Sequence, residues 1–171
     1  MKIAIIYASV TGNTKMVAES IKEGLKGENI IYFGPVTKDN IDADLFVVGS
    51  WTNRGTATNE IINFLKQLEN KKIAFFGTAG YGGSEEYYQT LFNRVKENIS
   101  SSNLLLGYFY CQGKMPLSVR ERYINMIKAN PADANLLVSL ENFDEALTHP
   151  DDKDLENAKN WIKEIIKKGG F

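Results

Sequence analysis

The first fourteen residues constrain this chain more than any other stretch does. A short apolar run, Ile3–Tyr7, is followed by a small and hydroxyl-rich segment and then by an amphipathic helical pattern. In the order strand, polar loop, helix, backbone amides and hydroxyls converge on the helix N-terminus, where the helix dipole favours an anion. The donors would be three hydroxyls and one side-chain amide, from Ser9, Thr11, Thr14 and Asn13. The segment therefore predicts a phosphate site built from neutral donors.

Two common phosphate loops do not fit this segment. A Walker A loop needs G-x-x-x-x-G-K-[ST] with a lysine that reaches the phosphates, but here Gly12 is the single glycine and Lys15 follows the last hydroxyl. A Rossmann fingerprint needs G-x-G-x-x-G and an acidic residue about twenty positions later, and it is absent as well. A hydroxyl-rich helix cap that binds nothing is the simplest alternative, because such caps are common.

Composition limits the class of protein. At 171 residues the chain is expected to form one domain, residues 1–171, with a sizeable core. The single cysteine, Cys111, excludes an intramolecular disulfide and is typical of a reducing compartment. Neither a signal-type segment nor an apolar stretch long enough to span a bilayer is visible, so we expect a cytoplasmic protein that does not bind membranes. A formal net charge of −1 argues against a nucleic-acid surface.

Strand and helix patterns alternate along the whole chain. Four further strands are expected at residues 29–33, 44–49, 72–77 and 104–111. Helices are expected at 13–25, from 58 or 59, from a cap at Ser84, from a capping box at Ser118–Glu121, and at 151–168, whereas residues 132–150 look irregular apart from a turn near 142–147. This alternation predicts an α/β domain with a parallel sheet. A receiver-type phosphorylation domain shares the alternation, but the acidic residues of its site are missing.

The hydroxyl-rich segment, Ser9-Val10-Thr11-Gly12-Asn13-Thr14, resembles the [ST]-x-T-G-x-T loop of the flavodoxin family. The resemblance extends over nearly the whole chain. It implies a doubly wound, five-stranded sheet with strand order 2-1-3-4-5 and helices on both faces. It also implies that this loop holds the 5′-phosphate of FMN, and that the loops after the third and fourth strands hold the flavin ring.

The family pattern implies a set of cofactor-binding residues in three loops. They are Ser9, Thr11, Gly12, Asn13 and Thr14 in the first loop, Ser50, Trp51, Thr52, Asn53, Arg54 and Gly55 in the second, and Thr78, Ala79, Gly80, Tyr81 and Gly82 in the third. Trp51 and Tyr81 lie where family members place the aromatic residues that flank the flavin, since a flat apolar ring favours stacking partners. The alternative is that Trp51 fills a loop and Tyr81 is an ordinary surface tyrosine. No metal site and no catalytic side chain are expected.

Four further residues or segments have narrower interpretations. By placing a cation beside the flavin, Arg54 could stabilise the anionic reduced form and so raise the reduction potential. Alternatively, Arg54 could be an exposed arginine that contacts a partner. Cys111 is better interpreted as a buried structural thiol than as a reactive one. The loop at residues 112–116 could shield one flavin face or meet a partner. His149 is expected at the start of the last helix, without a catalytic role.

The resemblance implies an FMN protein that passes electrons between redox partner proteins. Many electron-carrying flavodoxins are strongly acidic, and the modest net charge of this chain departs from that pattern. Three alternatives stay open: an FMN-dependent NAD(P)H:quinone-type oxidoreductase, a dedicated flavin subunit that feeds one large reductase, and a flavin-free interaction domain. The chain also looks weakly like short flavodoxin-like proteins that accompany anaerobic tetrapyrrole (bilirubin) reductases. Whether the protein is an enzyme by itself stays open.

Overall fold

The computed structural model describes residues 1–168, so the last three residues of the expected 1–171 domain lie outside the described part. Five parallel strands form one sheet in the order β2-β1-β3-β4-β5, which confirms the predicted topology. The strands are β1 (Lys2–Ala8), β2 (Asn29–Gly34), β3 (Leu45–Trp51), β4 (Lys72–Ala79) and β5 (Leu104–Gln112). The helices are α1 (Asn13–Gly24), α2 (Asn59–Leu65), α3 (Glu85–Lys96), α4 (Leu117–Ala129), α5 (Ala134–Ala146) and α6 (Asp152–Lys168).

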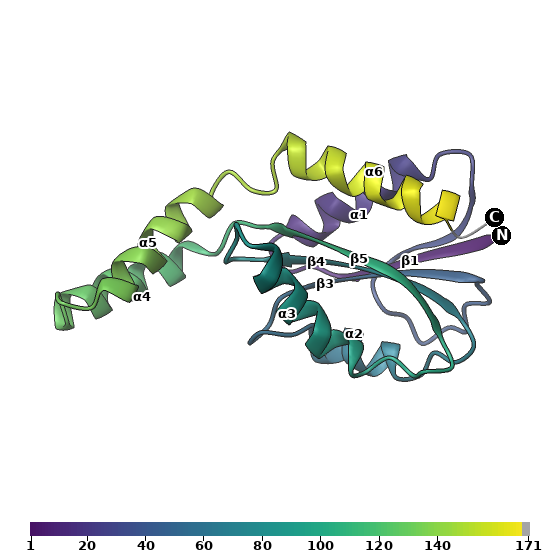
Figure 1. Ribbon diagram of the computed structural model, residues 1–171, viewed down its shortest axis with the longest axis horizontal. Coiled ribbons are helices and arrows are strands. Elements are labelled where there is room, and N and C mark those ends of the chain that lie inside the picture. The colour runs from purple at the N-terminus through teal and green to yellow at the C-terminus, as the bar shows by residue number, and fades with distance from the viewer. Residues whose placement is uncertain (169–171) are drawn as a thin grey trace.

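Helices cover both faces of the sheet, as Figure 1 shows. On one face α1 and α6 pack against Ile3, Ile5 and Val47 of β1 and β3. On the other face the core includes Phe46 and Phe75 together with residues of α2 and α3. The three inner strands are buried almost throughout, which is why they appear in the sequence as continuous apolar runs. Within the described residues, none of the helices is both long and apolar enough to cross a membrane.

Helices α1 and α6 approach each other closely at Gly24. A Cβ atom added at Gly24 would lie 2.8 Å from the backbone oxygen of Lys159 and 2.8 Å from Cγ2 of Ile162. Such distances are shorter than van der Waals contact, so this crossing requires the absence of a side chain. The closeness of the two helices seals one face of the sheet from β1 to β5.

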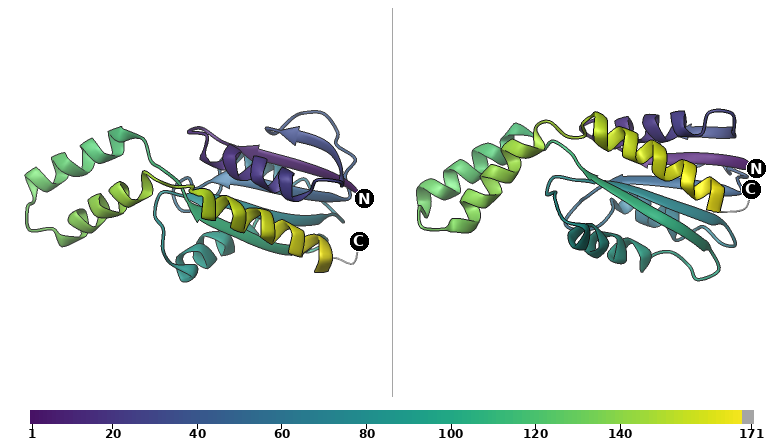
Figure 2. Two further views of the ribbon diagram at one scale, coloured as in Figure 1. Left: turned by 90° about the horizontal axis from the view of Figure 1, so that it is seen from above. Right: turned by 45° about the horizontal axis from the view of Figure 1, so that its top comes forward.

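Helices α4 and α5 form a hairpin that projects beyond the sheet, as the two views in Figure 2 show. The expected capping box at Ser118 is wrong: α4 begins at Leu117, Pro116 precedes it, and no side chain caps it. None of the residues of α4 is buried, and its Val119, Tyr123 and Ile127 are half-buried. Residues 134–146, expected to be irregular, form the thirteen-residue helix α5, with Asp133 accepting a cap hydrogen bond from the Asn135 amide.

The two ends of this hairpin are joined at its base. The backbone N–H of Lys114 donates to the carbonyl of His149 at 2.9 Å, so the segment that leaves β5 returns beside its starting point before α6 begins. The hairpin therefore leaves and re-enters the sheet domain at one point, between the last strand and the last helix.

Candidate functional site

The loops after β1, β3, β4 and β5 enclose a cleft of about 460 Å³ at the carboxyl edge of the sheet. Ligands of open α/β sheets bind at this edge, and the volume lies within the range of about 300–1,000 Å³ typical of small-molecule sites. The cleft is lined by nine of the residues predicted from the sequence: Thr11, Asn13, Trp51, Thr52, Asn53, Arg54, Thr78, Ala79 and Gly80. Four lining residues, Gly113, Lys114, Met115 and Pro116, belong to the loop at 112–116 that the sequence suggested could shield a flavin face. The sequence did not indicate three others: Val10, Val119 and Arg122.

The remaining predicted residues, Ser9, Gly12, Thr14, Ser50, Gly55, Tyr81 and Gly82, belong to the same three loops but do not line the cleft. Ser50, for example, is buried, and its hydroxyl accepts a hydrogen bond from the Thr58 amide at 3.0 Å. That contact holds the long loop against the start of α2. Ser50 therefore shapes the second loop from inside.

The first loop presents unpaired backbone donors. Within the described chain, the N–H groups of residues 11–14 donate no hydrogen bond, while the next amide, that of Lys15, donates to the Ser9 hydroxyl at 3.2 Å. Gly12 has φ +91°, a conformation that favours glycine, and a Cβ placed there would have no neighbour within 4 Å. Four N–H groups that lack a partner in the described chain, at a helix N-terminus, are the arrangement that binds a phosphate.

Thr14 differs from the other hydroxyl residues of the first loop. Its side chain is buried, and its Oγ1 lies 2.9 Å from Oγ1 of Thr78 at the end of β4. The Thr78 carbonyl in turn accepts from the Thr52 amide at 2.8 Å. These two bonds join the first, second and third loops, so Thr14 holds the loops in place.

Two buried polar atoms of the cleft have no partner. Asn13 donates through Nδ2 to the Lys114 carbonyl at 2.9 Å, but its Oδ1 is unpaired, and so is Oγ1 of Thr52. An unpaired buried polar atom costs about 1–3 kcal/mol, so each atom is poised to bond a polar group that enters the cleft. Gly113 keeps this region close-packed, because a Cβ there would lie 2.7 Å from Asn13 Nδ2.

The second loop contains a tight turn at Asn53–Thr56. Asn53 and Thr56 exchange two backbone hydrogen bonds, at 2.8 and 3.2 Å, and Arg54 and Gly55 between them both have positive φ, 51° and 83°. Positive φ at both central positions defines a type I′ turn. Arg94 of α3 donates through Nη1 to the Gly55 carbonyl at 3.1 Å. The turn therefore carries the exposed Arg54 side chain at the rim of the cleft.

The third loop is held by a residue that the sequence did not indicate. Asn142 of α5 is buried, donates through Nδ2 to the Gly80 carbonyl at 3.0 Å, and accepts from Gln112 Nε2 at 3.1 Å. Its Oδ1 also lies 3.4 Å from the Gly82 amide. Tyr81, in contrast, is 40% exposed and makes a T-shaped contact with Tyr87, with ring centroids 6.1 Å apart. In this conformation Trp51 lines the cleft and Tyr81 lies outside it.

The cleft is lined by basic side chains, and the buried thiol of Cys111 lies outside its lining. Burial raises the pKa of the Cys111 thiol well above its ordinary value, and Cys111 is nearly inaccessible. The prediction that Cys111 is buried is confirmed. The three cations that line the cleft, Arg54, Lys114 and Arg122, form no ion pair with any described residue. The rim of the cleft is therefore positive although the whole chain carries a net charge of −1.

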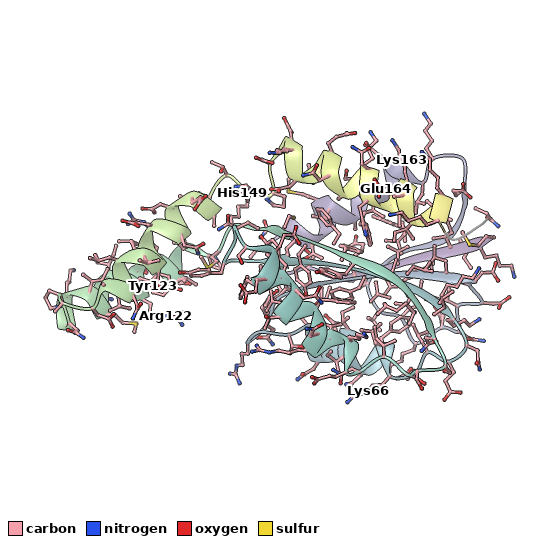
Figure 3. All side chains as sticks on the ribbon, viewed as in Figure 1. Lys66, Arg122, Tyr123, His149, Lys163 and Glu164 are labelled. Carbon is pink, nitrogen blue, oxygen red and sulfur yellow. The ribbon has the colours of Figure 1, made fainter. Side chains whose placement is uncertain are left out.

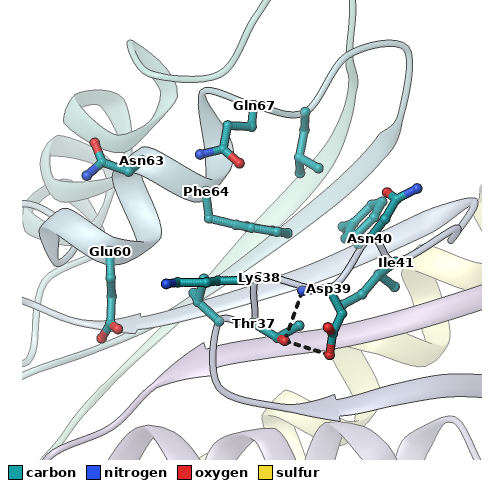
Figure 4. A pocket seen from close by; sticks show the side chains of 12 residues that line it. Thr37, Lys38, Asp39, Asn40, Ile41, Glu60, Asn63, Phe64 and Gln67 are labelled. Carbon is teal, nitrogen blue, oxygen red and sulfur yellow. Dashed lines mark hydrogen bonds between the residues drawn. The ribbon is translucent and has the colours of Figure 1, made fainter.

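A larger hollow of about 590 Å³ lies elsewhere, between the segment after β2 and helix α2. Figure 4 shows its lining, in which Thr37 donates to Asp39 at 3.1 Å while Glu60, Asn63 and Phe64 belong to α2. None of the predicted site residues lines this hollow. Size alone therefore does not identify the functional site, and the free donors of the first loop favour the smaller cleft.

Three potential metal ligands, His149, Asp151 and Asp154, gather before and within the first turn of α6. The Asp154 amide donates to Asp151 Oδ1 at 2.8 Å, and the Asp151 amide donates to Asp154 Oδ2 at 3.0 Å. His149 Nδ1 lies 2.5 Å from that same Oδ2. This reciprocal pairing is a capping box, and it agrees with the expected place of His149 at the start of the last helix.

The chain is similar to flavodoxin-like proteins over almost its whole length. Residues 4–163 match the flavodoxin domain family. A "flavodoxin-like domain-containing protein BilS" from Clostridium symbiosum is 34% identical, with 100% of this chain and 99% of that protein covered. A protein of the same name from Clostridioides difficile is 30% identical, with 100% and 99% covered. A solved short-chain flavodoxin associated with a non-canonical PDU bacterial microcompartment superimposes with a TM-score of 0.62 at 15% identity, covering 98% of this chain and 99% of the other.

Proposed function

The chain belongs to the flavodoxin domain family, and from this premise we propose that it binds FMN in the cleft and transfers electrons between redox proteins. Members of this family bind FMN at the carboxyl edge of the sheet. The single observation that supports the proposal is that the N–H groups of residues 11–14 donate no hydrogen bond within the described chain, in a loop whose Thr11 and Asn13 line the cleft together with an aromatic residue, Trp51. We further propose that residues 1–171 serve as one FMN-binding domain.

The first loop would bind the phosphate with neutral groups. The free amides of residues 11–14 and the hydroxyl of Thr11 are the available donors, and the N-terminal end of α1 adds its dipole. Lys15, the nearest cation in sequence, is exposed and pairs with Glu19 at 3.9 Å, so it is directed along the helix surface. A phosphate held in this way needs no side-chain cation.

The second and third loops would hold the ring. Trp51 offers a flat apolar surface, and Thr52 Oγ1 and Asn13 Oδ1 are the unpaired polar atoms available to the polar edge of a ligand. Bound FMN supplies the redox chemistry, accepting and donating one or two electrons. The protein's part is to fix the ring, exclude water from it and set the charge around it. Arg54, at the rim, would favour the more negative redox states and so raise the midpoint potentials.

Two further functions differ in how electrons arrive. A dedicated flavin subunit of one large reductase is favoured by the full-length similarity to two proteins named BilS and by the projecting hairpin. An NAD(P)H-dependent oxidoreductase would need a second nucleotide site, for which we find no motif in the sequence. Fast bleaching of the bound flavin by NADPH without a partner would favour the oxidoreductase.

Titration of the apo-protein with FMN and with riboflavin tests the proposal. In a Trp161→Phe background the fluorescence reports Trp51 alone. We expect stoichiometric quenching by FMN, and binding of riboflavin that is at least tenfold weaker because it lacks the phosphate. No quenching by FMN, and no change in the flavin spectrum, would contradict FMN binding. Equal affinity for both ligands would contradict the assignment of the first loop as the phosphate site.

A further inference from the structure

The α4–α5 hairpin is not explained by the fold. Its helices pack against each other, no residue of α4 is buried, and several large apolar side chains are exposed. These are Leu117, Met126, Leu137, Val138 and Leu147. Helices in proteins gain most of their stability by burying an apolar face, so a hairpin with this much unburied apolar surface is suited to a partner.

One face of α4 continues the lining of the cleft. Val119 and Arg122 line the cleft itself. Met126, which is 46% exposed, lies seven positions after Val119 and four after Arg122, and therefore on the same side of the helix. We call Val119, Arg122 and Met126 the docking face. A protein that covers this face would also sit over the cleft entrance, and electron transfer between proteins requires such short distances.

The charges on the hairpin are separated by helix. Helix α4 carries Arg120, Arg122 and Lys128 against one acid, Glu121, whereas α5 carries three acidic residues and no base. Arg120 is neutralised by Asp144 of α5, with Nε to Oδ1 at 2.8 Å. Arg122 has no ion pair with a described residue, and neither have Lys114 and Arg54 across the cleft. The docking face and the cleft rim thus present one positive surface.

We propose that the α4–α5 hairpin is a docking arm for the redox partner, and that the partner's matching surface is rich in carboxylates around an apolar centre. The proposal rests on the proposed function. Complementary charge steers association and fixes orientation, while the apolar residues of the docking face supply contact area. Asn142 and Met115 connect the arm to the third loop. Asn142 donates a hydrogen bond to the Gly80 carbonyl, and the Met115 side chain packs against Gly80.

The test uses two acceptors that share a haem and differ in charge. Native cytochrome c is basic, and lysine-succinylated cytochrome c is acidic. The FMN-loaded protein is reduced beforehand and mixed with each acceptor, each haem iron taking one electron from ferric to ferrous. We expect the succinylated acceptor to react faster at low salt, with a rate constant that falls as salt increases because charges are screened. The native acceptor should show the opposite salt dependence.

Two charge reversals on the same helix provide a matched comparison. Arg122 and Lys128 differ by six positions and so lie on different sides of α4. Arg122→Glu should slow reduction of the succinylated acceptor about tenfold, whereas Lys128→Glu, with the same change of charge, should alter it less than twofold. Met126→Glu should also slow it, because it places a carboxylate further along the arm. Figure 3 shows Arg122 on the hairpin, away from Lys66 and Lys163, which serve as distant controls.

FMN affinity and the flavin spectrum are measured first for every variant, so that loss of cofactor is separated from loss of docking. If wild-type protein fails to bind FMN, the proposed function fails. If FMN binds but Arg122→Glu and Lys128→Glu have equal effects, the docking face is wrong. If Arg122→Glu slows reduction of the succinylated acceptor but Met126→Glu does not, docking is confined to the cleft rim and the proposal of a docking arm is wrong. A dimer in light scattering that Met126→Glu dissociates would make the arm's partner a second copy.

Discussion

Individual hydroxyl groups of the first loop have different tasks, although the sequence motif treats them alike. Thr11 is exposed and lines the cleft, whereas Thr14 is buried against the hydroxyl of Thr78. A motif fixes which residues are present but not which way each side chain turns. Whether a threonine of the first loop faces the interior or the cleft depends on its contacts with β4, which is distant in sequence.

Substitution by valine separates these two roles. Thr14→Val removes the partner of the Thr78 hydroxyl, and we expect the free energy of unfolding to fall by about 1–3 kcal/mol. Thr11→Val should leave stability within about 0.5 kcal/mol and weaken FMN binding about tenfold, as expected for one lost hydrogen bond to a charged group. Urea unfolding and FMN titration of both variants measure this. Equal losses of stability would contradict the distinction.

Cys111 offers a second prediction for a single residue. Burial raises the pKa of its thiol, whereas the thiol of the unfolded chain has a pKa of about 8.5. The folded protein therefore keeps the proton at pH values where the unfolded chain has lost it. The thiol's contribution to stability is therefore complete below about pH 8 and decreases as the pH rises further. We expect alkylation by iodoacetamide at pH 8.5 to be at least a hundredfold slower in buffer than in urea. Comparable rates would show that the strand end opens readily.

Among the elements, the sheet could be predicted from the sequence and the hairpin could not. The strands are rich in apolar residues, and the three buried inner strands are continuous apolar runs, so all five were located within two residues at their ends. Helix α5 was missed because its single buried face consists of widely spaced residues, among them Leu136 and Phe143, interrupted by polar Asn142. Asn142 looks like a turn residue in the sequence, and its purpose becomes visible only when α5 lies against Gly80 and Gln112.

Removal of the Asn142 side chain tests this connection between elements. Asn142→Ala leaves the Gly80 carbonyl and the Gln112 amide with fewer partners, so we expect a loss of about 1–3 kcal/mol in stability. FMN binding should weaken as well, since the third loop loses its support from α5. Asn135→Ala, at an exposed position of the same helix, is the control and should change neither property. Unchanged FMN affinity in Asn142→Ala would show that the third loop holds its shape unaided.

The crossing of α1 and α6 predicts whether Gly24→Ala raises or lowers stability. Glycine to alanine in an exposed helix stabilises a protein by about 1 kcal/mol. At Gly24 the new methyl group would meet the Lys159 carbonyl at 2.8 Å, so we expect Gly24→Ala to destabilise by about 1–3 kcal/mol. Lys15→Ala, on an exposed side of α1, is the control for helix propensity. A higher unfolding midpoint for Gly24→Ala would mean that the two helices separate at low cost.

The whole molecule consists of a well-packed sheet domain and a lightly packed arm. The inner strands are almost completely buried, whereas α4 has no buried residue. Hydrogen exchange should therefore be much faster for the amides of α4 than for those of β1, β3 and β4, because local opening of the arm exposes little apolar surface. Mass spectrometry of exchange at neutral pH measures this. Protection of α4 equal to that of β3 would contradict the picture of two differently packed parts.

At this scale the family resemblance supplied the topology and the position of the cleft, and both agree with the described structure. It could not supply the sign of the charge around the cleft. Net charge is a sum over the chain, whereas the positive rim arises because Arg54, Lys114 and Arg122 come from segments that meet only in the folded protein. The modest net charge of −1 conceals this local concentration of cations.

The bond between the Lys114 amide and the His149 carbonyl closes the base of the arm. Because the chain leaves and re-enters the sheet domain at this one point, a change in the length of the arm need not move the strand before it or the helix after it. The arm and the cleft do not vary independently, however, because Asn142 of the arm supports the third loop and Val119 and Arg122 line the cleft.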